Sequence, residues 1–300
     1  MWLLLAFSSA AMLGLYDVAK KQAVTDNAVL PVLLFNTLFS SLIFLPTILD
    51  VELSLGWFDG TIFASAKEPL SVHLKVMLKA SIVLLSWIFG YFAIKNLPLT
   101  IVGPINATRP VMVLLGALLI FGERLNLWQW IGVSLSIFSL FLLARSSKKE
   151  GINFAKNSWI LMLAAAAMLG ACSGLYDKHI MRELNPIFVQ SWYNIYQMLL
   201  MGSVILLIWL PRRKESTPFH WSWAIPLISI CISIADMAYF YALTDEEAMI
   251  SIVSTIRRGS VIVSFLFGAM LLREKNLKSK AIDLIFILAG MIFLYIGSKN

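Results

Sequence analysis

Long apolar stretches separated by short polar links run through the whole chain. Each stretch is close to the roughly 20 residues that a helix needs to cross the hydrocarbon core of a bilayer. A proline in the first turn after an asparagine, as in Asn185-Pro186, is typical of a helix start. The pattern predicts an all-α membrane protein with about ten transmembrane helices. The stretches fall at residues 2–19, 28–49, 76–94, 98–121, 127–144, 158–176, 186–210, 221–243, 248–272 and 281–297.

Composition excludes a soluble globular protein. Hydrophobic residues make up 59% of the chain and charged residues only 14%, against about a quarter charged in soluble domains. Lys and Arg exceed Asp and Glu, 24 to 17. Most of these basic residues lie between apolar stretches, which is typical of membrane loops and does not indicate nucleic-acid binding.

An internal repeat divides the chain into two halves. Small residues four apart end in Gly14-Leu15-Tyr16-Asp17 in the first stretch and in Gly174-Leu175-Tyr176-Asp177 in the sixth. Such spacing places small residues on one helix face, where a neighbouring helix can approach closely. Five spans in each copy would invert the second relative to the first. We therefore expect two inverted five-helix repeats, residues 1–145 and 158–300, joined by a basic linker at 146–157.

The two halves differ in one link. Residues 50–73 form a long loop that contains Trp57, Phe58, Ile62 and Phe63, whereas the corresponding link around 211–220 is short. Aromatic and aliphatic side chains in a membrane loop favour a short interfacial helix. A disordered loop is the alternative.

Arg109 is the first charge predicted deep inside the membrane. It lies about 16 Å along its helix, near the bilayer midplane, between Pro104 and Pro110, which interrupt helical hydrogen bonding. Intramembrane charge usually marks a functional site, although burial against freed carbonyl groups is a structural alternative. No acidic residue occupies the matching depth near Ser86-Trp87, so Arg109 is expected to lack a counterion of its own.

The second half carries Arg257 and Arg258 at the equivalent place. Adjacent helical residues point about 100° apart, so we expect at most one of them to face the same cavity as Arg109. Spans eight and nine form a predicted hairpin that brings Asp236 to the depth of these arginines. An ion pair between Asp236 and Arg257 or Arg258 follows, with either a structural or a substrate-binding role.

Polar and aromatic residues at middle depth complete the predicted substrate site. Tyr and Trp offer flat apolar area with one polar tip, which suits small organic ligands, although bundle packing is the alternative for each. The candidates are Asn36, Trp87, Tyr91, Asn106, Tyr193, Asn194 and Tyr239. The sequence indicates no enzyme, cofactor or metal site, because it contains no nucleotide-binding glycine loop and no metal-spaced His, Cys or Asp cluster.

Residues 97–143 resemble the EamA signature of the drug/metabolite transporter superfamily, through Arg109-Pro110 and the helix-closing Gly122-Glu123-Arg124-Leu125. Residues 248–297 repeat it, with Arg273-Glu274-Lys275-Asn276-Leu277 but without a proline that matches Pro110. The resemblance implies metabolite transport, often export, through a central cavity between the halves. It also implies that Glu123 and Glu274 end their helices and serve structure more than substrate binding.

These observations predict a secondary transporter in the plasma (inner) membrane that exports a small anionic or zwitterionic metabolite, such as an amino acid. The driving force would be a coupling proton or an exchanged metabolite. One alternative is an exporter of cationic drugs that uses Asp236, and another is a membrane sensor or scaffold that transports nothing. The charge distribution favours both termini outside the cell, whereas the family resemblance implies both inside.

Overall fold

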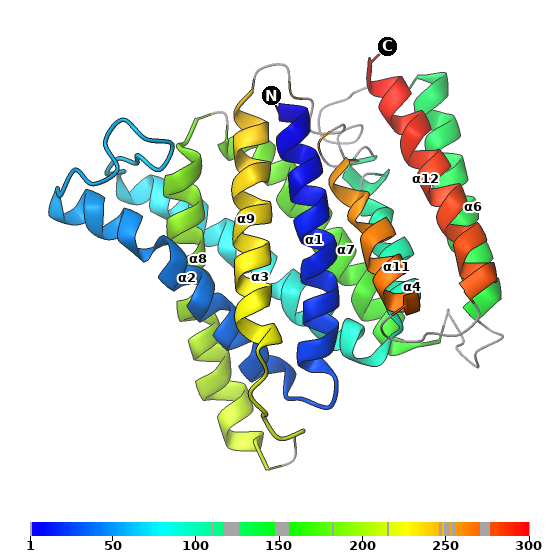
Figure 1. The fold of residues 1–300 in the computed structure, drawn as a ribbon, viewed down its shortest axis with the longest axis horizontal. Coiled ribbons are helices and arrows are strands. Elements are labelled where there is room, and N and C mark those ends of the chain that lie inside the picture. Colours follow the sequence, from blue (N-terminus) through cyan, green and yellow to red (C-terminus); the bar gives the residue numbers. More distant parts are fainter. Residues whose placement is uncertain are drawn as a thin grey trace.

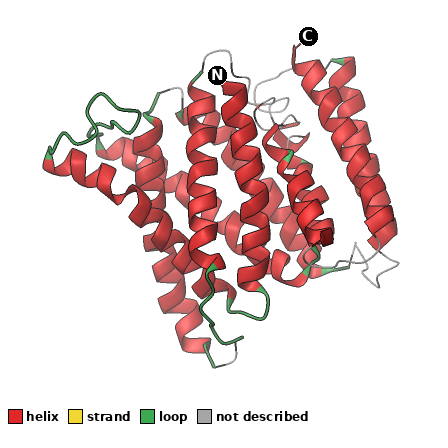
Figure 2. Ribbon diagram, in the orientation of Figure 1, coloured by secondary structure: helices red, strands yellow, loops and turns green. Residues whose placement is uncertain are grey.

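The structure is a computed structural model that describes residues 2–109, 111–113, 115–116, 126–147, 156–181, 183–214, 216–245, 248, 253, 256–270 and 277–299. Within these ranges the secondary structure is helical and there is no β-strand (Figures 1 and 2). The helices are α1 (Trp2–Val24), α2 (Val29–Leu53), α3 (Leu70–Asn96), α4 (Leu99–Ala107), α6 (Leu127–Ser147), α7 (Ser158–Ile180), α8 (Pro186–Val204), α9 (Ala224–Thr244), α11 (Ser260–Met270) and α12 (Leu277–Lys299).

Several helices have the length and apolar composition of membrane spans. Six qualify among the described residues: α1, α2, α3, α7, α9, and α8 with the π-helical and 3₁₀ turns that continue it to Arg212. The predicted count of about ten spans is not reached on this criterion and stays a prediction. The α1 N-terminus and the α12 C-terminus lie at the same end of the bundle (Figure 1).

Two helices extend beyond the apolar stretches that predicted them. Helix α1 continues to Val24, so Lys20, expected in the first link, lies inside the helix and is buried. Helix α3 begins at Leu70 instead of 76. Backbone hydrogen bonding continues a helix until the chain breaks it, whatever the polarity of the side chains. The break after α1 is a turn in which Asp26 adopts a φ of 52°.

The long link between α2 and α3 runs over residues 54–69 and is shorter than the predicted loop at 50–73. It contains turns but no helix, so the prediction of an interfacial helix was wrong. Asp50 holds the loop instead, since its carboxylate accepts hydrogen bonds from the backbone N–H groups of Trp57 (2.6 Å) and Phe58 (3.3 Å). Backbone N–H groups that are satisfied by a side chain do not need a helix.

Extensive packing contacts join helices that are far apart in the sequence. Helix α1 packs along α9 and against α11, α3 packs along α7 and against α8, and α2 packs against α8 and α9. Helices α6 and α12 form a pair at one edge of the bundle (Figure 1). A Cβ atom on Gly14 would lie 2.4 Å from Val263, and one on Gly103 would lie 2.6 Å from Val261. The predicted close approach at Gly14 is therefore confirmed.

Helical hydrogen bonding is irregular beside both sets of membrane arginines. The Thr108 N–H bonds to the Ile105 carbonyl (3.2 Å), and the Gly259 N–H bonds to the Ile256 carbonyl (2.9 Å). Both are three-residue steps, tighter than the α-helical step of four. Arg109 directly follows the first irregular residue. Pro104 lies within α4 without ending it, and Pro110 lies outside the described residues.

Candidate functional site: a charged cavity inside the helix bundle

A cavity of about 130 Å³ lies among α1, α3, α4, α7, α8, α9 and the residues that precede α11. Its lining is rich in charge, which is costly in a membrane and is usually tied to function. In the part of the chain that the structure describes, eight charged side chains contribute to it: Asp17, Lys20, Lys79, Arg109, Asp177, Asp236, Arg257 and Arg258.

Most residues predicted for a substrate site line this cavity. They are Arg109, Arg257, Arg258, Asp236, Trp87, Tyr91, Asn106, Tyr193 and Tyr239. Asn36 and Asn194 are not in the lining and are buried between helices instead. The Asn36 side chain donates to the Tyr91 hydroxyl (3.1 Å) and accepts from Ser229 (3.1 Å). A substrate role for the lining residues stays a prediction.

Asp236 and Arg257 form an ion pair in the cavity wall, as the predicted hairpin required. Both side chains are 11% exposed. The Arg257 Nε also donates to the Ser9 hydroxyl on α1 (3.0 Å), and its guanidinium lies 4.2 Å from the centre of the Tyr239 ring. The pairing of these two charges is confirmed. Because the Asp236 carboxylate is engaged, it is a poor binding site for a cation.

A second ion pair joins Lys79 on α3 to Asp177 on α7. Both residues are almost fully buried, at 2% and 5% exposure. The Lys79 ammonium also lies 4.8 Å from the ring centre of Tyr193 and 4.7 Å from that of Phe240. Burial of a charged pair requires close partners of this kind. The pair connects the two halves of the sequence through the cavity wall.

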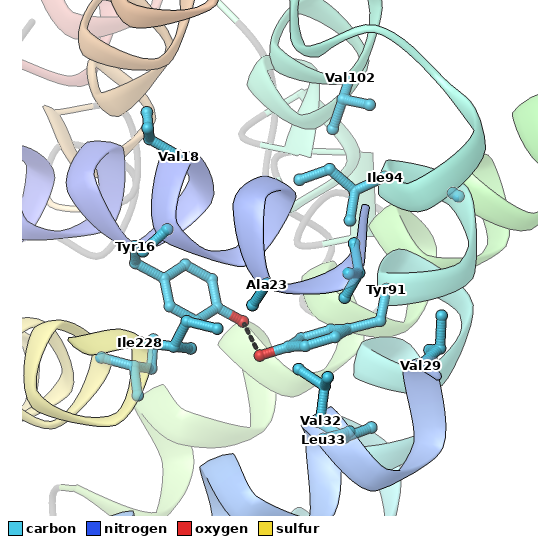
Figure 3. Packing of buried hydrophobic residues seen from close by; sticks show 14 of the residues in the cluster. Tyr16, Val18, Ala23, Val29, Val32, Leu33, Tyr91, Ile94, Val102 and Ile228 are labelled. Atoms are coloured by element: carbon cyan, nitrogen blue, oxygen red, sulfur yellow. Dashed lines mark hydrogen bonds between the residues drawn. The ribbon is translucent and has the colours of Figure 1, made fainter. Parts of the chain in front are cut away.

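A third ion pair lies within α1, between Lys20 and Asp17 (3.0 Å). The Lys20 ammonium also contacts the faces of Tyr16 (4.3 Å) and Tyr91 (5.2 Å). The Tyr16 hydroxyl donates to that of Tyr91 (3.5 Å) within a surround of aliphatic side chains (Figure 3). The Ser264 hydroxyl donates to Asp17 (3.4 Å). Lys20 and Asp17 therefore neutralise each other.

Arg109 and Arg258 differ from the other lining charges, because neither forms an ion pair or a hydrogen bond within the described part of the chain. The Nε atom of each is buried and without a partner. Arg258 is repelled by Arg109 and Arg257 and attracted by Asp17. Arg109 is likewise attracted by Asp17 and repelled by Arg257. Gly170 on α7 provides the space for Arg109, since a Cβ atom there would lie 2.7 Å from its Nη1. An arginine stays protonated in proteins, so both charges persist.

The expectation that at most one of Arg257 and Arg258 faces the cavity was wrong. Both line it. Their contacts differ, because Arg257 pairs with Asp236 whereas Arg258 forms no ion pair with a described residue.

Sequence reasoning missed several of the charged lining residues. Asp17 and Asp177 were assigned to a packing motif, Lys20 to a link, and Lys79 was passed over. The general rule that an intramembrane charge marks a functional site would have identified Lys79 within its apolar stretch. Among the described residues no cluster of three or more His, Cys, Asp or Glu side chains could hold a metal ion. Glu123 and Glu274 lie outside the described residues.

Comparison with known proteins decides the family. The EamA-like transporter family matches the chain twice, over residues 1–145 and 157–296. The chain belongs to the EamA-like transporter family. Together with the long apolar helices, membership makes it an integral, multi-pass membrane protein, and the family points to transport of a small molecule.

Other comparisons concern sequence relatives and fold. No curated protein sequence matches the chain. A crystal structure, described only as that of a protein, is 16% identical and has a TM-score of 0.64. The alignment covers 99% of this chain and 97% of that one, so the two share a fold along their whole length.

Proposed function

We propose that this EamA family member is a secondary transporter that exports a small anionic or zwitterionic metabolite by alternating access. The observation that carries the proposal is the pair of uncompensated arginines, Arg109 and Arg258, in an otherwise ion-paired cavity. Both residues are half-buried and their Nε atoms are fully buried, and a charge held out of water without a partner is destabilising. A bound acidic group would compensate it.

The charges of the cavity favour an anion over a cation. Among the described residues, five basic side chains and three carboxylates line it, and together they carry a net charge of +2. Each carboxylate is paired with a basic residue. A cationic substrate would have to displace one of these partners and would add to the excess of positive charge. Asp236, the residue on which a cation exporter would depend, is among the paired ones.

Helix packing supports ten spans arranged as two inverted five-helix repeats. Exchange of the two halves converts the α1–α9 contact into α7–α3 and the α2–α9 contact into α8–α3, both of which exist. The contacts α2–α8 and α6–α12 convert into themselves. Such equivalence is expected for repeats 1–145 and 158–300 related by an axis in the membrane plane. The linker would then be 146–157.

Alternating access requires contacts between the halves that break in turn. At one end, the α1–α2 turn bonds to the second half, because the Asn27 side chain accepts from the His220 N–H (2.8 Å) and donates to its carbonyl (2.7 Å). Towards the other end, the Lys79–Asp177 pair joins α3 to α7. Opening of the cavity to one side of the membrane would break one of these two sets of contacts between the halves. A proton gradient or metabolite exchange would drive the cycle.

The test is efflux from proteoliposomes loaded with a defined mixture of amino acids, organic acids and organic cations, read by mass spectrometry. Wild type should release anionic or zwitterionic solutes. Arg109→Ala should abolish the release without loss of melting temperature, and Arg109→Lys should restore little, because an ammonium cannot replace a planar two-pronged donor. Arg213→Ala, which removes an exposed arginine, is the matched control.

Two results would contradict the proposal. Release of cations alone would favour the cation exporter, and release of nothing above protein-free liposomes would favour a sensor or scaffold. Full activity of Arg109→Ala would remove Arg109 from substrate binding. A large drop in its melting temperature would show instead that Arg109 is structural.

A further inference from the structure

Ion pairing accounts for most of the charge in the part of the cavity lining that the structure describes. Each of the three lining carboxylates is paired with a basic side chain, so these six charges are neutral as a set. The lining also includes Arg109 and Arg258. The excess of positive charge therefore resides on the two arginines that have no partner.

We infer that the substrate is a compact organic dianion whose two acidic groups are bound by Arg109 and Arg258. The inference rests on the proposed transport function and narrows its substrate class. Charge balance is its basis. A monoanion would leave one guanidinium uncompensated, and a zwitterion would bring an ammonium group into a cavity whose three carboxylates are already paired.

The geometry suits two separate acidic groups. Each guanidinium has a buried Nε without a hydrogen-bond acceptor, and a planar fork of donors matches a carboxylate or phosphate. The two side chains come from different halves of the chain. A ligand that engages both would therefore connect the halves, which a single acidic group at one arginine would not do.

Cavity size limits the ligand to a small molecule. At about 130 Å³, the cavity has space for on the order of ten water-sized groups. A four- or five-carbon dicarboxylate has about that many non-hydrogen atoms. The buried Asn106 Oδ1, which lines the cavity without a partner, is available to accept a hydrogen bond from a substrate hydroxyl group.

Matched ligands that differ in one charge test the inference. Succinate carries two carboxylates at pH 7.5, and succinamate replaces one of them by a neutral amide of nearly the same shape. Glutarate and glutaramate form a second such pair. Affinities for the full-length protein in detergent are measured by ligand-dependent melting shifts, and transport is measured in proteoliposomes.

In at least one pair the dianion should bind wild type at least tenfold more tightly than the monoanion. Arg109→Gln and Arg258→Gln should each reduce that preference to about twofold or less, whereas the exposed-site control Arg213→Gln should retain it. If either arginine variant does not fold, the wild-type comparison alone decides the charge preference.

The outcomes separate this inference from the proposed function. Equal affinity for dianion and monoanion in both pairs, with anions still transported, would overturn the dianion and leave the anion transporter. Transport of putrescine, a compact dication, without transport of any anion would overturn both. Absence of binding and transport for every probe would also count against both.

Discussion

Substitution of Gly170 by alanine tests the position of Arg109 without changing any charge. A Cβ atom at residue 170 would lie 2.7 Å from Arg109 Nη1, 2.8 Å from Cζ and 3.1 Å from Nε. Ordinary contacts begin near 3.4 Å, so the guanidinium would have to withdraw by about 0.7 Å, the difference between 3.4 and 2.7 Å. The far end of a flexible side chain can make that movement, so the fold should persist.

The expected effect is on ligand binding. A misplacement of about 1 Å in a positioning group can cost as much as a hundredfold in rate, so we expect Gly170→Ala to lower transport about tenfold, equivalent to about 1.4 kcal/mol. Stability should not fall, because alanine is favoured over glycine inside a helix by about 0.5–1 kcal/mol. Proteoliposome efflux and melting temperature measure the two effects separately.

Gly174→Ala is the matched control on the same helix, one turn further on. Its Cβ atom would lie 4.0 Å from Val113, an ordinary contact, so transport should stay within about twofold of wild type. Equal transport by the Gly170→Ala and Gly174→Ala variants would refute the reasoning. It would mean that the Arg109 guanidinium is not used at the position the structure gives it.

Two further substitutions test other parts of the structure. Asp236→Asn should destabilise the protein by about 3–5 kcal/mol, because it leaves the Arg257 charge without its partner, and Asp236→Asn with Arg257→Gln should recover part of that loss in a detergent melting assay. A double variant no more stable than the single one would show that the pair contributes little. Asp50→Ala should make the loop at 54–69 more sensitive to limited proteolysis, because two backbone N–H groups lose their acceptor at about 1–3 kcal/mol each. Glu52→Gln, which removes only an exposed ion pair, is its control, and equal cleavage of the two variants would contradict the assigned role of Asp50.

The sequence by itself determined the helical membrane architecture and part of the site. In lipid, every backbone polar group has to be satisfied within the protein, so long apolar stretches can be interpreted as helices without knowledge of their neighbours. The cost of placing a charge in lipid identified four candidate site residues within the predicted spans: Arg109, Arg257, Arg258 and Asp236. The Asp236–Arg257 pair could be predicted because a hairpin relates the two residues through local spacing alone.

Tertiary structure decided how the charges are paired. Lys79 and Asp177 lie on helices that are distant in the sequence, and only the packing of α3 along α7 brings them together. Continuation of α1 past its apolar stretch moved Lys20 from a predicted link into the cavity wall. Together with Asp236–Arg257, these two pairs leave Arg109 and Arg258 as the described lining charges without an ion-pair partner. Local patterns place a charge in the membrane, but long-range packing determines its partner, because Coulomb interactions in a low-dielectric interior depend on distances of a few ångströms.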